Sequence, residues 1–320
     1  MLSRVADSLY WIAQNMERAD SVAKLLSVRL VSILENQDPV VGTENDWEEV
    51  IEIASDKKEF KRLYDTYNRE SVIQYLAFSK QNMNSIFSCI TLSRENAKMI
   101  REILPIEFWE VINDLYMEIK GINFFEDNTE KLNRFLQGIH EKYFLLQGII
   151  SGFMLQEEGY LFLMFGKYLE VIRKLARTMD VYYHKRRTER FEKEDIQYHY
   201  WSSVLSSLSG YHSYIQKYQA SMNPVKIVDY LLFDSAHPRS AKFGVQQLVY
   251  AFQTLEKKQV NTYSQKLYDK IEELHQELRY ESVKNLPVSL HEYCQRIQSL
   301  CDSVGIAIME TYYLGEMSPT

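Results

Sequence analysis

The run from Leu2 to Leu26, LSRVADSLYWIAQNMERADSVAKLL, decides the fold of this chain. Its apolar residues alternate between spacings of four and three, which is typical of one long amphipathic helix. The stripe continues past the quoted run and consists of Val5, Leu9, Ile12, Met16, Ala19, Ala23, Leu26, Leu30 and Ile33. The sequence therefore predicts that the chain begins with a helix of eight or more turns.

Two large aromatic residues of this helix, Tyr10 and Trp11, lie off the apolar stripe on opposite flanks. Because such side chains are costly to leave in water, we expect the helix to be packed on more than one side. This packing would carry Glu17, Arg18 and Asp20 into a partly enclosed setting. Enclosed charges must pair or take part in chemistry, and both roles stay open at this point.

Composition favours an all-α fold. The chain has 320 residues, of which 46% are hydrophobic and 25% charged, a balance typical of a folded globular protein. Its 11 glycines and 6 prolines are too few for the many tight turns of a sandwich or barrel. We therefore expect a large multi-helix bundle forming one domain over residues 1–320. Two pseudo-repeated halves, 1–155 and 156–320, are an alternative. When Glu17 is laid on Glu170, four further pairs align, which indicates either a duplication or two amphipathic helices: Ala13 with Gly166, Gln14 with Lys167, Ala23 with Ala176 and Lys24 with Arg177.

Periodicity and capping residues predict the further helices. The expected segments, in residue numbers, are 47–54, 56–67, 70–78, 82–104, 105–119, 131–155, 156–187, 193–219, 225–233, 240–255, 260–284 and 290–314.

Charge and cysteine content narrow the possible partners and location. The formal net charge is −7 and no large basic domain stands out, which argues against nucleic acid as a partner. The only cysteines, Cys89, Cys294 and Cys301, show no CxxC spacing, so we expect no disulfide framework and a reducing, cytoplasmic setting. No secretory segment is recognisable, and the most apolar long window, 143–155, is too short to span a membrane.

No recognised catalytic or cofactor template is present in the sequence. Glu272 and His275 have the spacing of one di-iron half-motif, but no second such motif accompanies them, and a solvated helix face explains them better. A Gly-x-Ser-x-Gly elbow and a Gly-rich phosphate loop are both missing. We therefore expect no metal and no cofactor.

Five ordered segments resemble the bacterial alpha-E family, an all-helical family of domains of unknown function. They are SLYWIAQNMERADSVAKLL from Ser8, SRENAKMIREIL from Ser93 with FWEVIN from Phe108, MLQEEGYLFLMFGKYLE from Met154, YHYWSSVLSSLSGYHSY from Tyr198, and LLFDSAHPRSAKFGVQQL from Leu231. The resemblance spans nearly the whole chain. It implies an association with an ATP-grasp amide-ligase-like protein and a transglutaminase-like protein, and hence with peptide or isopeptide metabolism.

The resemblance also implies candidate site residues. Carried onto this chain, the family's recurrent polar positions fall on Tyr10, Trp11, Glu17, Arg18, Arg94, Glu95, Asn96, Glu158, Glu170, Pro238 and Arg239. The chain departs from the family pattern where arginines are expected, with Gln14 near the first glutamate and Lys167 near the second. Lysine and glutamine cannot replace the bidentate arginine pairing, so this member either binds something less anionic or has a site that has become structural.

Three hypotheses of function follow. The first is a helical accessory protein that binds the amide-ligase-like protein or its peptide product. The second is an enzyme of amide-bond chemistry with Glu17 and Glu158 or Glu170 as acid and base, and Arg94, Lys167 or Arg239 holding an anion. The third is a homo-oligomeric scaffold whose contacts use some of the 23 tyrosines and 15 phenylalanines.

Overall fold

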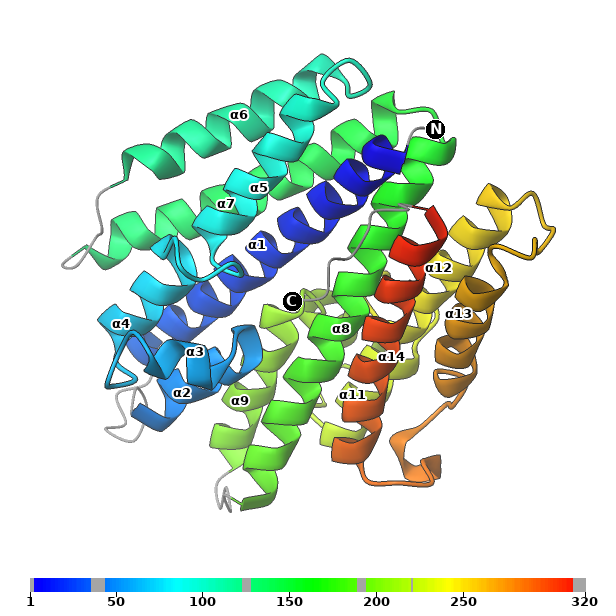
Figure 1. Cartoon of the computed structure of the whole chain (residues 1–320). Coiled ribbons are helices and arrows are strands. Elements are labelled where there is room, and N and C mark those ends of the chain that lie inside the picture. The colour runs from blue at the N-terminus through cyan, green and yellow to red at the C-terminus, as the bar shows by residue number, and fades with distance from the viewer. Residues whose placement is uncertain (1–2, 36–43, 123–127, 189–193, 220, 313–320) are drawn as a thin grey trace. The chain divides into compact units, whose positions relative to one another are not determined.

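The computed structural model confirms the all-α fold (Figure 1). It describes residues 3–35, 44–122, 128–188, 194–219 and 221–312, and within these ranges it contains fourteen α-helices and no strand. The long helices are α1 (Ser3–Glu35), α7 (Thr129–Phe153), α8 (Glu158–Thr188) and α14 (Leu290–Tyr312). The expected loop at 36–45 and the expected frayed tail at 315–320 lie wholly or mostly outside the described residues.

The shorter helices complete the fold. They are α2 (Glu44–Ala54), α3 (Lys57–Lys61), α4 (Arg69–Ile73), α5 (Ile86–Met99), α6 (Ile106–Gly121), α9 (Glu194–Ser207), α10 (Tyr211–Tyr218), α11 (Pro224–Phe233), α12 (Ala241–Leu255) and α13 (Gln265–Glu277). A π-helical turn, Gln74–Phe78, continues α4, and a 3₁₀ turn, Val283–Asn285, precedes α14.

The chain folds into two compact units that interleave along the sequence. The first unit consists of Met1–Gln14, Leu155–Arg187 and Asn223–Thr320, and the second of Asn15–Met154 and Thr188–Met222. Helix α1 therefore contributes its first residues to the first unit and the remainder to the second. Within the first unit α12 packs on α11 and α13, and α13 packs on α14; within the second, α6 packs on α5 and α7 (Figure 1).

Capping residues set several helix starts as the sequence predicts. The Asn68 side chain accepts a hydrogen bond from the Ser71 amide and the Ser71 hydroxyl accepts one from the Asn68 amide, which together form a capping box for α4. Asn223 caps α11, with Pro224 as its first residue, and Ser240 caps α12.

Four predicted helices are wrong in extent. The predicted helix 260–284 is helical only as α13, Gln265–Glu277, with a separate 3₁₀ turn at Val283–Asn285. The predicted helix 193–219 is broken between α9 and α10, where Ser209 adopts a left-handed conformation with φ of 57°. The segment 82–104 is helical only from Ile86 to Met99, because Asn82 bonds to the backbone of Tyr75 and Asn84 while Ser85 caps α5. Helix α3 ends at Lys61, well short of the predicted 67.

Gly166 permits a very close approach between α8 and the first turns of α1 in the first unit. A Cβ atom at this position would lie 2.2 Å from the Tyr10 carbonyl oxygen and 3.2 Å from the Gln14 amide nitrogen. Both atoms belong to helix backbone, so neither can move without displacing a helix. Any residue larger than glycine at position 166 would therefore force α8 away from α1.

We predict that Gly166→Ala lowers the free energy of unfolding by about 3 kcal/mol or more, because the added methyl overlaps backbone atoms. Gly148→Ala is the matched control, since Gly148 is an exposed position in the middle of α7 where a Cβ would meet nothing within 4 Å. That variant should gain about 0.5–1 kcal/mol of stability from helix propensity. Urea denaturation measures both, and equal effects of the two substitutions would contradict the close approach.

Candidate functional site

The part of α1 in the second unit carries buried carboxylates. Glu17 and Asp20 are both fully buried, with exposed fractions of 0%. This confirms the enclosed setting expected for them from the sequence. Ionised carboxylates removed from water are very costly unless they are paired and hydrogen-bonded, so their partners determine what this face of α1 can do.

Helix α7 supplies a partner for each carboxylate. Tyr143 donates a hydrogen bond from its hydroxyl to Glu17 Oε2, and His140 Nδ1 lies 2.6 Å from Asp20 Oδ1. From the first pair to the second, the residue number rises from 17 to 20 on α1 and falls from 143 to 140 on α7. The two helices therefore run antiparallel where they meet. We call these four residues the polar ladder. It connects segments more than one hundred residues apart in sequence.

Two further polar side chains of α1 contact the carboxylates of the polar ladder. Ser21 Oγ lies 3.5 Å from Glu17 Oε1, and Lys24 Nζ lies 2.9 Å from Asp20 Oδ2. Lys24 also donates to the Ser209 hydroxyl at 2.6 Å. Residues 17, 20, 21 and 24 share one helix face, because residues three and four apart are neighbours on a helix. A continuous row of polar contacts therefore runs along α1.

Arg18 faces a different element from Glu17. Its guanidinium donates to Asn84 Oδ1 at 3.0 Å, and Asn84 lies in the turn before α5. The adjacent residues Glu17 and Arg18 thus link α1 to α7 and to the start of α5, respectively.

Arg94 and Glu95, two further candidates, lie on α5. Arg94 contacts Glu95 and the next helix along the chain, α6. Arg94 donates to Asn113 Oδ1 at 2.9 Å and to Glu95 Oε1 at 2.7 Å. Its guanidinium carbon also lies 4.6 Å from the centroid of the Tyr116 ring on α6, within the range of a cation–π contact. The Arg94 side chain is only 20% exposed. These contacts indicate that Arg94 fastens α5 to α6.

The remaining candidate acids lie in the first unit. Glu158 is exposed at the start of α8, whereas Glu170 is 3% exposed on the same helix. Twelve residues separate them, which at 1.5 Å per residue places them about 18 Å apart along the helix axis. They therefore belong to different surroundings and cannot form one acid–base pair with each other.

The aromatic and basic candidates of the first unit occupy three elements. Tyr10 is 1% exposed and meets Trp11 edge to face at 5.4 Å between centroids. Lys167 Nζ lies 5.1 Å from the Tyr168 ring centroid on α8, and Arg239 is half-buried in the turn before α12.

Sequence reasoning missed three groups that bind the α1 carboxylates or their partners: His140, Tyr143 and Lys24. His140 and Tyr143 have a helical i, i+3 spacing within a strongly apolar segment. That spacing is the one signal in the sequence that could have pointed to a shared partner.

The cysteines of α14 and the Glu272/His275 pair have surroundings that indicate a structural role. Cys294 and Cys301 are buried on α14, and burial raises the pKa of the Cys301 thiol to about 12, so neither resembles a reactive thiolate. Glu272 and His275 pair with each other at 3.5 Å on α13, with side chains 36% and 38% exposed. Among the described residues no group of three or more His, Cys, Asp or Glu side chains is arranged to hold a metal ion.

His237 is a buried imidazole in the turn between α11 and α12. It is 5% exposed and stacks on Tyr230 at 4.4 Å between centroids. Neither ring nitrogen has a hydrogen-bond partner among the described residues. Burial and the nearby Arg239 charge lower the pKa of His237 to about 4. The folded protein therefore holds this imidazole in its neutral form.

This environment predicts an acid-sensitive stability. Unfolding returns the pKa of His237 from about 4 to its ordinary 6.5, so protonation below pH 6.5 favours the unfolded chain. The contribution is fully present above pH 6.5 and should fall by about 2 kcal/mol between pH 7.5 and pH 5. In His237→Phe, which keeps an aromatic ring against Tyr230, this part of the pH dependence should be missing. Urea denaturation at both pH values tests it, and identical pH profiles for the two proteins would refute the assignment.

The Alpha-E family model, described as a predicted alpha-helical domain with a conserved ER motif, matches residues 1–313. The chain has two Glu-Arg pairs, Glu17-Arg18 in α1 and a second at residues 189–190 outside the described part. No curated protein and no solved structure matches the chain. Among the described residues, no helix has both the length and the apolar character required to cross a membrane. The family match covers nearly the full chain, and the protein therefore belongs to the Alpha-E family.

Proposed function

We propose that this protein is a helical accessory protein of the bacterial cytoplasm that binds the amide-ligase-like or the transglutaminase-like protein associated with its family. In this role α1 organises the fold, and an exposed surface makes the contact with the partner. The proposed process is the formation, modification or breakdown of peptide or isopeptide bonds.

One observation favours this proposal over the enzyme hypothesis: the α1 carboxylates are paired with side chains of the protein itself. Both oxygens of Glu17 face hydroxyl groups, those of Tyr143 and Ser21, and both oxygens of Asp20 face basic groups, those of His140 and Lys24. A general acid or base must reach the proton it transfers. Glu17 is fully buried and hydrogen-bonded, so its environment favours a structural role.

An exposed apolar surface supports binding to another protein. Met99, Ile103 and Ile106 lie within eight residues at the turn joining α5 to α6, and their exposed fractions are 56%, 48% and 61%. We call them the hairpin cluster. Contiguous exposed apolar side chains often mark protein–protein contacts. We assign the hairpin cluster to the partner interface.

We predict that the tagged protein retains one of the two partners, encoded in the same genome, through purification. The double variant Ile103→Glu/Ile106→Glu should raise the dissociation constant at least about tenfold, because it places two charges in an apolar contact. Ile306→Glu is the matched control, since Ile306 is 47% exposed on α14. Isothermal titration calorimetry should show less than about a twofold change for this control.

Three outcomes would count against this function. If the wild-type protein binds neither partner, the accessory role is wrong. If it forms a defined homo-oligomer that the hairpin cluster variant dissociates, the scaffold hypothesis is correct instead. If Glu17→Gln keeps the fold and partner binding but abolishes an amide-bond reaction of the purified complex, the enzyme hypothesis is supported, with Glu17 and Glu158 or Glu170 as acid and base.

A further inference from the structure

Helices α5 and α6 pack against each other, and the short turn between them carries the hairpin cluster (Figure 1). The turn residues Ile100 and Leu104 are buried, with exposed fractions of 3% and 7%. The Ile103 amide also donates to the Ile100 carbonyl at 2.9 Å. A surface that is held in one conformation loses little entropy on binding, so the hairpin cluster is a preorganised contact.

Arg101 adds a positive charge to the same turn. Its guanidinium carbon lies 5.1 Å from the centroid of the Trp109 ring on α6, within the range of a cation–π contact. The Arg101 side chain is exposed, and within the part of the chain that the structure describes no carboxylate lies at ion-pair distance from it. The indole therefore holds a guanidinium whose hydrogen-bond donors are open to a ligand.

Arg94, the second guanidinium beside this indole, is already paired. Its guanidinium carbon lies 5.6 Å from the Trp109 centroid. It donates hydrogen bonds to Glu95 Oε1 at 2.7 Å and to Asn113 Oδ1 at 2.9 Å. The Arg101 charge, by contrast, has no counterion within the described chain. A guanidinium binds a carboxylate through two parallel hydrogen bonds, so a carboxylate is the group that Arg101 selects.

Three exposed acids near the turn limit the charge of the ligand. Glu102 follows Arg101 directly, and Glu107 and Glu110 lie in the first turns of α6. Lys98 is exposed in the last turn of α5. Because these acids outnumber the two cations, a strongly acidic ligand would be repelled. A single carboxylate placed at Arg101 gains the guanidinium contact without bringing further negative charge to the acids.

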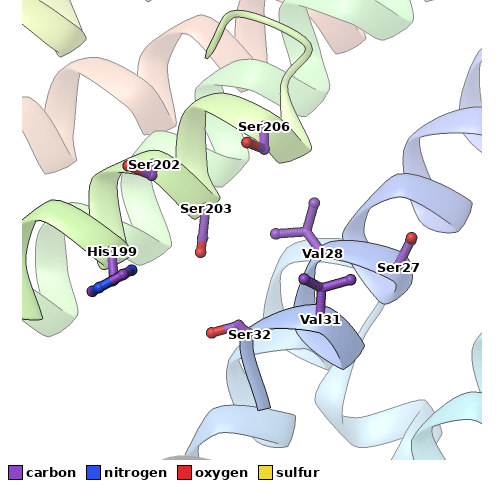
Figure 2. Close-up of a pocket in the computed structure, with 8 residues that line it drawn as sticks. All are labelled: Ser27, Val28, Val31, Ser32, His199, Ser202, Ser203 and Ser206. Carbon is purple, nitrogen blue, oxygen red and sulfur yellow. The ribbon is translucent and has the colours of Figure 1, made fainter. Parts of the chain in front are cut away.

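A held charge distinguishes this surface from the pocket between α1 and α9 in the second unit. That pocket has a volume of about 310 Å³, and Figure 2 shows its eight lining residues, five of which are serines. These eight residues include no lysine or arginine, so they supply no fixed cation that would select a ligand. The turn between α5 and α6 combines exposed methionine and isoleucine with arginine. Arginine, methionine and aromatic residues are enriched at protein–protein interfaces.

We propose that the hairpin cluster and Arg101 bind a segment of the partner protein in which apolar side chains flank a single aspartate or glutamate. The apolar side chains of that segment cover Met99, Ile103 and Ile106, and its carboxylate accepts two hydrogen bonds from the Arg101 guanidinium. This inference rests on the proposed function, because the segment belongs to whichever of the two partner proteins binds the chain.

A side-chain carboxylate fits this surface better than the C-terminal carboxylate of a partner. C-terminal carboxylates are usually captured by successive backbone N–H groups. In this turn the Ile100 and Ile103 amides already donate to the Ala97 and Ile100 carbonyls, and Pro105 has no amide hydrogen. The charge at this surface therefore comes from the Arg101 side chain, which suits an aspartate or glutamate.

The first test measures the affinity of variants for the partner by isothermal titration calorimetry. Arg101→Ala should raise the dissociation constant at least about tenfold, because it removes a charge-assisted, two-bonded contact. Arg101→Lys should have a smaller effect, because an ammonium group keeps the charge but loses the paired donors. Arg279→Ala is the matched control, since Arg279 is an exposed arginine of the first unit. It should change the dissociation constant by less than about twofold.

The second test identifies the carboxylate. A carbodiimide joins an amine to a carboxylate in direct contact through an amide bond, and tandem mass spectrometry then identifies both linked residues. In the complex of the Arg101→Lys variant we expect a link from the introduced amine to an aspartate or glutamate side chain that lies among apolar residues of the partner. The wild-type complex should lack this link, because a guanidinium does not react in this way.

The outcomes separate this inference from the proposed function. If the partner binds but Arg101→Ala changes its affinity by less than about twofold, or the introduced amine links to the partner's C-terminal carboxylate or to nothing, the inference is wrong and the accessory function stands. Tighter binding by Arg101→Ala would show that Glu102, Glu107 and Glu110 face a basic partner and would also overturn it. If neither partner protein binds the wild-type chain, both the function and the inference fail.

Discussion

Two carboxylates of helix α1 are buried away from water, and the helix packing of the second unit depends on how they are paired. Glu17 and Asp20 are buried one turn apart on α1, and each would destabilise the fold unless a partner lay opposite it. Tyr143 and His140 provide those partners in antiparallel register on α7. Because only one sliding position of the two helices satisfies both pairs, the polar ladder selects a register that apolar packing alone would leave less defined.

A steric constraint has the same effect in the first unit. The backbone contact at Gly166 admits no side chain, which fixes how closely α8 approaches the first turns of α1. A second glycine acts similarly at α12, where a Cβ on Gly244 would lie 2.8 Å from the Ile172 side chain on α8. Helix α1 is therefore held by close packing over its first residues and by buried polar pairs over its middle.

The sequence allowed the helices and the enclosure of Glu17 and Asp20 to be predicted, because both follow from local spacing and from the cost of exposing Tyr10 and Trp11. The partners could not be predicted in the same way. Tyr143 and His140 lie more than one hundred residues from α1, and their i, i+3 spacing shows only that they share a helix face, not which element that face contacts. The break at Ser209 was missed although Ser209-Gly210 is a dipeptide typical of turns, because the aromatic-rich runs on both sides were interpreted as one helix.

Glu17 stabilises the fold through its contact with Tyr143, and a double-mutant cycle measures this contribution. Glu17→Gln, Tyr143→Phe and the combined variant would be unfolded with urea alongside the wild-type protein. We expect a coupling energy of about 1.5–3 kcal/mol, the range for a hydrogen bond to a charged group. A coupling energy below about 0.5 kcal/mol, with all variants folded, would show that the two side chains act independently and would contradict the claim.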